Sequence, residues 1–190
     1  MKKDFKREYF SIPNLMGYFR LLVVPIYLYL YITATETKDY YIAAAVMAVS
    51  FLSDFFDGKI ARKFNMVTEF GKILDPIADK VTQGAMAISF SFRFPAMIPL
   101  LILFVCKEGF MGIVGAYMMK KGYRMDGAQM HGKVCTAVLD VVMLIILMFP
   151  DISYTIVNIL VCISMAVMLY SFFRYVKMYL EVWKEQKEKA

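Results

Sequence analysis

Eight residues between positions 54 and 79 have types and spacing that can support chemistry. They follow the pattern D-x2-D-G-x2-A-R-x8-G-x3-D-x3-D, which places them at Asp54, Asp57, Gly58, Ala61, Arg62, Gly71, Asp75 and Asp79. The chain around them is apolar enough for a lipid bilayer, where carboxylates are costly and usually serve a function. Four carboxylates in this setting indicate a divalent metal site.

The spacing predicts that the motif lies on two neighbouring helices. Its first five residues fall at i, i+3, i+4, i+7 and i+8, and its last three are spaced by four, so each group forms one helical stripe. The short connection between the groups makes the helices antiparallel neighbours, and the two stripes can face each other. Facing carboxylates repel unless about two divalent cations neutralise them, and hard oxygen ligands favour Mg²⁺ or Mn²⁺.

Small and basic residues accompany the carboxylates. Gly58 and Ala61 leave space beside the expected metals, and the planar guanidinium of Arg62 suits phosphate. Because such metal sites commonly hold phosphate oxygens, the pattern favours a phosphorylated substrate. A lone aspartate at a helix end is more often a solvated cap, but four in two matched stripes fit that interpretation poorly.

The composition indicates a membrane protein. Of the 190 residues, 60% are hydrophobic, which exceeds the share in ordinary soluble domains. The net charge of +6 lies mostly in short segments between apolar runs, so anionic lipid headgroups, and not nucleic acid, are the expected partner. The cysteines are single and widely spaced, which argues against disulfides and zinc; they are Cys106, Cys135 and Cys162.

The apolar runs predict an all-α integral membrane fold with six transmembrane helices, each near the ~20 residues that a bilayer requires. The predicted spans cover about residues 14–33, 40–64, 71–92, 95–119, 132–149 and 152–178. We expect a single domain over 1–190, with a short amphipathic helix at the interface within 1–12 and a cytoplasmic tail at 180–190. No small-residue cleavage site follows the first span, so it is not expected to be a cleavable signal.

The distribution of lysine and arginine predicts the orientation. The N-terminal segment, the connection at 62–72, the loop at 120–124 and the stretch at 174–189 are basic, whereas the intervening segments hold only Lys38 and Arg93. Because basic residues stay inside, both termini and the motif should lie at the cytoplasmic face of the cell membrane. An even number of spans likewise places both termini on one side of the membrane.

At these residues the chain resembles the CDP-alcohol phosphatidyltransferases, integral membrane enzymes of phospholipid synthesis. Every fixed position of that family's signature is matched, and so is its six-span layout. The resemblance implies that Asp54, Asp57, Asp75 and Asp79 hold two divalent metals at the diphosphate of a CDP-lipid. It also implies that Asp79 is the general base, which deprotonates the attacking hydroxyl while CMP leaves.

The resemblance further implies a binding site for the CDP-lipid, CDP-diacylglycerol. The family's glycine and arginine contact this substrate, a later threonine is another polar contact, and an N-terminal asparagine lies near the nucleotide. The small residues of the two stripes complete the expected binding site for the CDP-lipid. Its residues are Asn14, Gly58, Ala61, Arg62, Thr68 and Gly71. A homodimer is implied as well.

The acceptor alcohol is predicted from a narrower resemblance. Residues 12–25 and 68–80 resemble the bacterial glycerol-phosphate branch of the family, which implies glycerol 3-phosphate as acceptor and phosphatidylglycerophosphate as product. Lys107, Lys133 and Arg174 lie near the inner ends of the last three spans, where unpaired cations are costly, so an acceptor phosphate between them is expected. Snorkelling to lipid headgroups is the alternative for these cations.

Other members of the family stay open as alternatives. Lys107-Glu108 stands where glycerol-phosphate members often have Arg-Glu, and Gly17 stands where they often have threonine. A cardiolipin synthase shares much of the pattern and takes an intact lipid as acceptor, and other members take serine or inositol phosphate.

Two unrelated classes of protein use some of the same features. An intramembrane prenyltransferase also holds a diphosphate with Mg²⁺ and aspartates, but it needs more spans and a second aspartate motif. A cation transporter usually has internal repeats with interrupted helices. The sequence contains neither signal. His131, the only histidine, lies outside the motif and is predicted to be an interfacial side chain without a ligand or base partner.

Overall fold

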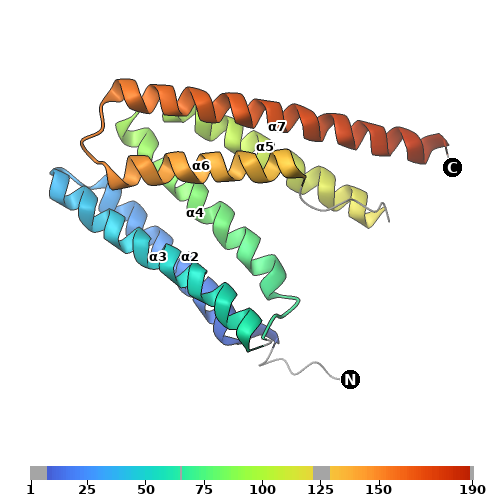
Figure 1. The fold of residues 1–190 in the computed structure, drawn as a ribbon, viewed down its shortest axis with the longest axis horizontal. Helices are drawn as coiled ribbons and strands as arrows, with labels where there is room; N and C mark the ends of the chain where they lie inside the picture. Colours follow the sequence, from blue (N-terminus) through green and yellow to red (C-terminus); the bar gives the residue numbers. More distant parts are fainter. Residues whose placement is uncertain (1–7, 65, 122–128, 189–190) are drawn as a thin grey trace. The chain divides into compact units, whose positions relative to one another are not determined.

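A computed structural model describes residues 8–64, 66–121 and 129–188, without the side chains of residue 62 and residues 185–188. The described residues form helices and connections but no strand, which confirms the all-α prediction (Figure 1). The helices are α2 (Ile12–Ile32), α3 (Thr37–Lys63), α4 (Gly71–Arg93), α5 (Met97–Lys120), α6 (Met130–Met148) and α7 (Tyr154–Glu188). Cys106, Cys135 and Cys162 are free in the structure.

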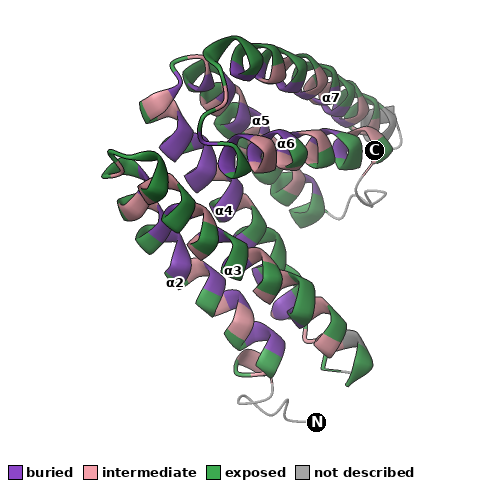
Figure 2. Ribbon diagram, turned by 60° about the vertical axis from the view of Figure 1, so that its left-hand side comes forward, coloured by how far each residue is buried: buried purple, intermediate pink, exposed green. Residues whose placement is uncertain are grey.

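The chain falls into two compact units. The first comprises Met1–Phe92 and Leu147–Asp151, and therefore contains α2, α3 and nearly all of α4. The second comprises Arg93–Ile146 and Ile152–Ala190, and contains α5, α7 and most of α6. In both units the buried residues form stripes along the helices, while the opposite faces are exposed (Figure 2). Exposed faces that are apolar, as here, suit contact with lipid.

Five of the described helices are long and apolar enough to cross a membrane. They are α2, α3 over Thr37–Ala61, α5, α6 and α7 over Tyr154–Lys184. The helix outside this set is α4, whose first ten residues include Lys72, Asp75, Asp79 and Lys80. The structure thus supports a multi-pass membrane protein, and the sixth span stays a prediction.

The helices of the first unit begin at defined caps. The hydroxyl of Ser11 accepts a hydrogen bond from the backbone N–H of Asn14, and proline follows in the first turn of α2. In α4, the hydroxyl of Thr68 accepts a bond of 2.9 Å from the N–H of Gly71. At the start of α3, Asp39 accepts bonds from the N–H groups of Thr35 and Glu36, each of 3.1 Å. These bonds satisfy N–H groups that a helix start leaves without a partner.

Within the first unit, α2 packs along α3, and side-chain hydrogen bonds join α2 to α4. Three contacts at successive levels join α2 to α4 and to the residue Thr68 just before it: Asn14 with Thr68, Arg20 with Asp79, and the Tyr27 hydroxyl with that of Ser89 at 2.7 Å. The residue numbers rise together, so α2 and α4 run in the same direction. The aspartates of α4 therefore lie beside the first half of α2.

Aromatic and methionine side chains contribute to the core of the second unit. Met118 of α5 packs with Tyr175 and Tyr179 of α7, and the rings of Phe110 and Phe172 lie 5.3 Å apart. Near the other end of these helices, the ring of Phe94 lies 5.3 Å from that of Tyr154. These contacts hold α7 against α5.

Two boundaries differ from the sequence prediction. The last helix continues to Glu188, beyond the predicted end at residue 178, and the start of the expected tail at 180 is helical. The extension is rich in good helix formers, and the exposed side chains of Lys177 and Glu181 form an i,i+4 pair at 3.8 Å. Of the expected interfacial helix, residues 8 and 9 are helical, and residues 1–7 lie outside the described part of the chain.

Candidate functional site

The four motif aspartates lie in the first unit, on the two helices that the sequence predicts. Asp54 and Asp57 are on α3, and Asp75 and Asp79 are on α4. Asp57 is buried with 5% of its surface exposed, whereas the side chains of Asp54 and Asp79 are about half exposed. The charges of Asp54 and Asp75 both act on Asp57, so the two stripes are within electrostatic range of each other. The structure thus brings both stripes to one place.

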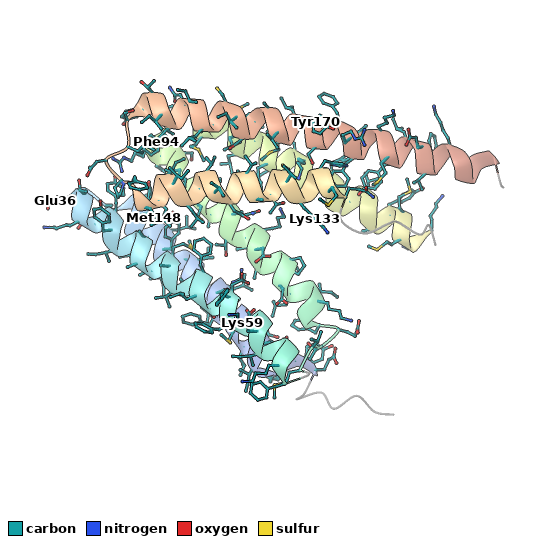
Figure 3. The ribbon with its side chains drawn as sticks, viewed as in Figure 1. Glu36, Lys59, Phe94, Lys133, Met148 and Tyr170 are labelled. Atoms are coloured by element: carbon teal, nitrogen blue, oxygen red, sulfur yellow. The ribbon has the colours of Figure 1, made fainter. Side chains whose placement is uncertain are left out.

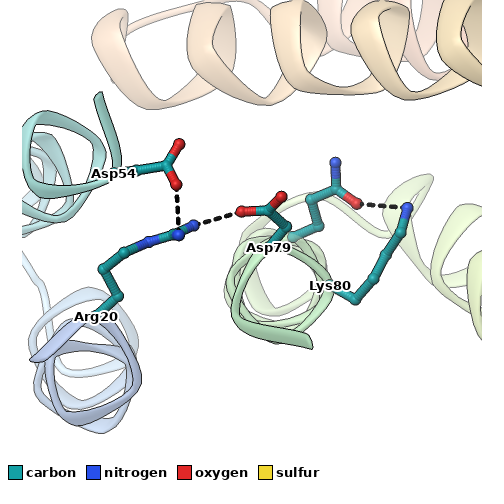
Figure 4. Close-up of polar contacts among 5 residues, drawn as sticks. Arg20, Asp54, Asp79 and Lys80 are labelled. Atoms are coloured by element: carbon teal, nitrogen blue, oxygen red, sulfur yellow. Dashed lines mark hydrogen bonds and ion pairs between the residues drawn. The ribbon is translucent and has the colours of Figure 1, made fainter. Parts of the chain in front are cut away.

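A residue of α2 completes this cluster. One guanidinium nitrogen of Arg20, Nη1, bonds to Oδ1 of Asp54, and Nη2 bonds to Oδ1 of Asp79 at 2.5 Å (Figure 4). The Arg20 side chain is 3% exposed, and its Nε is buried without a hydrogen-bond partner. On the other side of α4, the ammonium of Lys80 donates to Gln83 at 3.1 Å. A single arginine therefore links all three helices of the first unit.

This arrangement bears on the expected metals. In the described part of the chain, no three acidic, histidine or cysteine side chains are drawn together around a common point that could hold a metal ion. The Arg20 guanidinium lies between Asp54 and Asp79 and engages one oxygen of each. Meanwhile Oδ2 of Asp57 is buried without a hydrogen-bond partner. A buried carboxylate oxygen without a donor is costly, and a hard divalent cation would satisfy it. The donor set of these residues therefore fits a divalent metal.

Three predicted lipid contacts form a polar group at the start of α4. The side-chain amide of Asn14 donates to the Thr68 hydroxyl at 3.1 Å and to the backbone carbonyl of Glu8 at 2.7 Å. A Cβ atom on Gly71 would lie 2.7 Å from Oδ1 of Asn14, so only glycine fits without displacing it. The carboxylate of Glu8 accepts a bond from the N–H of Phe70. Asn14, Thr68 and Gly71 thus lie together, and the bonds join the start of α2 to the start of α4.

The other predicted lipid contacts lie on α3. Gly58 and Ala61 are partly exposed and share the helix with Asp54 and Asp57. The backbone of Arg62 belongs to α3, but its side chain lies outside the described part of the structure. Its phosphate contact therefore stays a prediction.

The predicted acceptor cations lie in the second unit, one on each of three helices: Lys107 on α5, Lys133 on α6 and Arg174 on α7. Lys107 is 2% exposed, whereas Lys133, labelled on α6 in Figure 3, and Arg174 are exposed. Lys107 has a carboxylate partner in the structure, because its ammonium lies 2.7 Å from Oε1 of Glu108. Adjacent residues normally diverge on a helix. Here burial favours the nearest carboxylate as partner, because an isolated charge would be costly.

His131 has more partners than the sequence predicts. It is partly buried, its Nδ1 lies 3.3 Å from the hydroxyl of Ser171, and its ring centre lies 4.5 Å from that of Tyr175. Lys107 and Arg174 are close enough for their charges to act on it. The structure therefore gathers two of the three acceptor candidates near His131, while Lys133 follows it on the same helix.

Arg20 is the site residue that the motif does not contain. A signal for it exists in the sequence, because it is a lone arginine inside an apolar span, and such charges pair with others in the membrane. Its partners are 34 and 59 residues away, and the sequence pattern alone could not identify them.

Comparison with known proteins identifies the family of the chain. The family model for CDP-alcohol phosphatidyltransferase matches residues 10–177. A protein of Aquifex aeolicus named CDP-diacylglycerol–glycerol-3-phosphate 3-phosphatidyltransferase is 30% identical over 172 residues, which cover 87% of this chain and 93% of the relative. A Rickettsia typhi protein of the same name is 40% identical over 79 residues. That match covers 41% of this chain and 43% of the relative, so the chain spans less than half the length of the Rickettsia protein.

A third relative has a different name. A Streptomyces coelicolor protein named cardiolipin synthase (CMP-forming) is 28% identical over 129 residues, which cover 66% of this chain and 60% of the relative. The match of the family model extends over α2 to α6 and most of α7, and it includes every motif aspartate together with Arg20. On this evidence the chain belongs to the CDP-alcohol phosphatidyltransferase family.

Proposed function

We propose that this chain transfers a phosphatidyl group from CDP-diacylglycerol to glycerol 3-phosphate, giving phosphatidylglycerophosphate and CMP. The observation that carries the proposal is the convergence of the four motif aspartates of α3 and α4 within one unit. The names of the Aquifex and Rickettsia relatives support the choice of substrates. The Aquifex relative weighs more, because nearly its whole length is covered.

Two divalent cations, Mg²⁺ or Mn²⁺, would be held by Asp54, Asp57, Asp75 and Asp79. When bound, such cations supply positive charge at the diphosphate oxygens of the CDP-lipid. The buried oxygen of Asp57 that lacks a hydrogen-bond partner supports this assignment. The CDP-lipid would lie along the same stripes, against Asn14, Gly58, Ala61, Arg62, Thr68 and Gly71.

The chemical step needs a base and an oriented hydroxyl. In our proposal the carboxylate of Asp79 takes the proton from the acceptor hydroxyl, whose oxygen attacks the β-phosphorus that carries the diacylglycerol. The bond from this phosphorus to the bridging oxygen of the diphosphate breaks, and CMP leaves with the electron pair. The half-exposed side chain of Asp79 is accessible for this role. General-base assistance contributes roughly 10²–10⁴-fold to the rate.

Lys107, Lys133 and Arg174 would hold the phosphate of the acceptor. The proximity of Lys107 and Arg174 to His131 supports a basic site in the second unit, although Glu108 already offsets part of the charge of Lys107. The basic connections favour both termini and the motif at the cytoplasmic face of the cell membrane, and the enzyme would act as a homodimer.

A cardiolipin synthase is the second candidate, because the Streptomyces relative carries that name. Such an enzyme would use phosphatidylglycerol, an intact lipid, in place of glycerol 3-phosphate. Members of the family that take serine or inositol phosphate are further alternatives.

A product assay separates these functions. The purified chain is given CDP-diacylglycerol and Mg²⁺ or Mn²⁺ with glycerol 3-phosphate, phosphatidylglycerol, serine or inositol phosphate, each in a separate reaction. We expect CMP and phosphatidylglycerophosphate with glycerol 3-phosphate alone. If cardiolipin forms from phosphatidylglycerol, the acceptor is phosphatidylglycerol in place of glycerol 3-phosphate. No CMP release with any of these acceptors would contradict the proposed transfer.

A further inference from the structure

Arg20 is a charged side chain in an unusual position. It lies on α2, a helix long and apolar enough to span a membrane, and it is 2% exposed. About 12 Å of helix separates it from Ile12, at 1.5 Å per residue, so it is deeper than an end-of-helix side chain that snorkels to water. Burial of this kind requires a counter-charge, and the structure provides Asp54 and Asp79.

The pairing is unequal in charge. Four motif carboxylates surround one guanidinium, which leaves a formal charge of −3 in the group. The electrostatic contacts extend beyond the two bonded aspartates, because the charge of Arg20 also acts on Asp57 and Asp75. Arg20 thus neutralises part of a cluster that would otherwise repel itself.

Arg20 bonds to two of the four carboxylates that would hold the metal. Its Nη1 and Nη2 bond to Oδ1 of Asp54 and Oδ1 of Asp79, and both aspartates belong to the motif. While the guanidinium occupies the space between these two side chains, a cation cannot bridge them. The bonds must break, or at least turn to the second oxygen of each carboxylate, before a metal can bind there.

We infer that Arg20 is the internal counter-cation of the metal-free site, and that divalent cations displace its guanidinium from Asp54 and Asp79. The inference rests on the proposed metal-dependent function and deepens it. Arg20 keeps the carboxylates paired inside an apolar unit until metal arrives. It thereby lowers the apparent metal affinity, because binding must first disrupt two charge-assisted hydrogen bonds.

Two possible roles of Arg20, as a competitor of the metal and as a scaffold for the carboxylates, predict opposite changes in metal affinity when Arg20 is removed. If Arg20 competes with metal, its removal tightens metal binding. If Arg20 instead holds the carboxylates in the geometry that a metal requires, its removal weakens binding. The sign of the change in metal affinity therefore tests the inference, independently of turnover.

The experiment measures Mn²⁺ binding to the full chain, stripped with EDTA and without CDP-lipid, by the EPR signal of free Mn²⁺. Arg20→Met is expected to bind Mn²⁺ at least about 10- to 150-fold more tightly than wild type, the range for one charge-assisted hydrogen bond, because wild type must give up two. Arg20→Lys, which keeps the charge, should stay nearer to wild type. Arg20→Met should also be less stable in EDTA and regain stability with Mn²⁺, because metal replaces the missing cation.

Lys72→Met is the matched control for the loss of one positive charge near the site. Lys72 is in the first turn of α4, but it is exposed and pairs with Glu69 at 2.8 Å. Its removal should change Mn²⁺ affinity by less than ~5-fold, as expected for an exposed charge. An equal gain in Mn²⁺ affinity in Lys72→Met and Arg20→Met would show that the loss of any nearby positive charge has this effect. That result would overturn the inference.

A second measurement covers the case in which Arg20→Met does not fold. The ¹⁵N NMR signals of the Arg20 guanidinium, assigned by their loss in Arg20→Lys, are followed in wild type while diamagnetic Mg²⁺ is added. We expect separate Nη signals without metal and an averaged signal with metal, because the released guanidinium rotates. Unchanged signals at saturating Mg²⁺ would contradict displacement.

The outcomes separate this inference from the proposed function. If wild type binds Mn²⁺ and Arg20→Met binds it equally well or more weakly, the counter-cation role alone is overturned. Failure of both wild type and Arg20→Met to bind Mn²⁺ would overturn the metal site and the inference together.

Discussion

At the scale of single residues, the four motif carboxylates differ in how far water reaches them. Asp57 is buried and one of its oxygens has no hydrogen-bond partner, whereas Asp54 and Asp79 are half exposed and share Arg20. Asp57 is consequently the carboxylate for which a metal would change the environment most. The same residue offers the clearest test of the metal site.

We predict that Asp57→Asn loses most of the metal-dependent stabilisation and nearly all turnover. A ligand present at 100 times its Kd stabilises a folded protein by ~2.7 kcal/mol, and the variant should lose this gain. In EDTA the variant should be at least as stable as wild type, because repulsion from Asp54 and Asp75 is relieved.

Thermal unfolding with EDTA and with Mn²⁺ measures both effects for Asp57→Asn. Glu181→Gln is the control, since it removes an exposed carboxylate of α7. Its Oε1 atom lies 3.8 Å from Nζ of Lys177. An equal rise of Tm with Mn²⁺ in wild type and Asp57→Asn would show that metal does not use this side chain.

Residue types and spacing were enough to predict the motif, because helical periodicity is visible in a sequence. The grouping of Asp54, Asp57, Asp75 and Asp79 follows from two stripes joined by a short connection. The bonds of Arg20 could not be predicted in the same way, because they join positions that are far apart in the chain. Pairing at such distances depends on which helices pack together.

At the scale of elements, the junction between α2 and α4 depends on the absence of a side chain at Gly71. The Asn14 amide is fixed there by Thr68 and by the carbonyl of Glu8, so it cannot easily move away from an added methyl group. The positions of Asp75 and Asp79 follow from where α4 begins. A change at this junction should therefore be transmitted to the carboxylates.

We predict that Gly71→Ala destabilises the protein by ~1–3 kcal/mol, the usual cost of overpacking, and lowers turnover. An added Cβ would lie 2.7 Å from Oδ1 of Asn14 and 3.0 Å from Oγ1 of Thr68. Gly109→Ala is the matched control, since no atom beyond the neighbouring residues and backbone of its own helix lies within 4 Å of its added Cβ. It should stabilise α5 by ~0.5–1 kcal/mol through helix propensity. Urea unfolding of both variants measures the difference, and equal stability would contradict the proposed packing.

The element boundaries were predicted less well than the element types. Apolar runs indicate a helix, but polar helix formers such as those that carry α7 to Glu188 look like a tail. For α4, the charges that make the site also reduce its apolar character, which is why its membrane crossing stays a prediction. The same residues that reveal function thus obscure the span count.

At the scale of the whole molecule, our proposal assigns residues of both units to the reaction. The motif belongs to the first unit and the basic side chains near His131 belong to the second. If the second unit binds only the acceptor, changes there should affect one substrate and not the other.

We predict that Arg174→Met lowers kcat/KM for glycerol 3-phosphate by roughly 10- to 150-fold, because one charge-assisted contact is worth ~1.5–3 kcal/mol. The KM for CDP-diacylglycerol should change little. Lys177→Met is the control, since Lys177 is an exposed cation three residues later on α7 whose partner is Glu181. Initial rates with each substrate varied in turn measure the effect. Similar losses for both substrates would indicate that Arg174 is structural or interacts with headgroups.

The order in which the chain is made gives the Arg20 pairs a consequence for biogenesis. Asp54 follows Arg20 by 34 residues and Asp79 by 59, so a ribosome adding ~5–20 residues per second exposes the arginine about 3–12 s before its second partner. During that interval α2 carries a charge that costs ~2.5–3.5 kcal/mol at the centre of a bilayer. The first helix should therefore remain near the insertion machinery until α3 and α4 emerge, and the three helices should enter the lipid as a group.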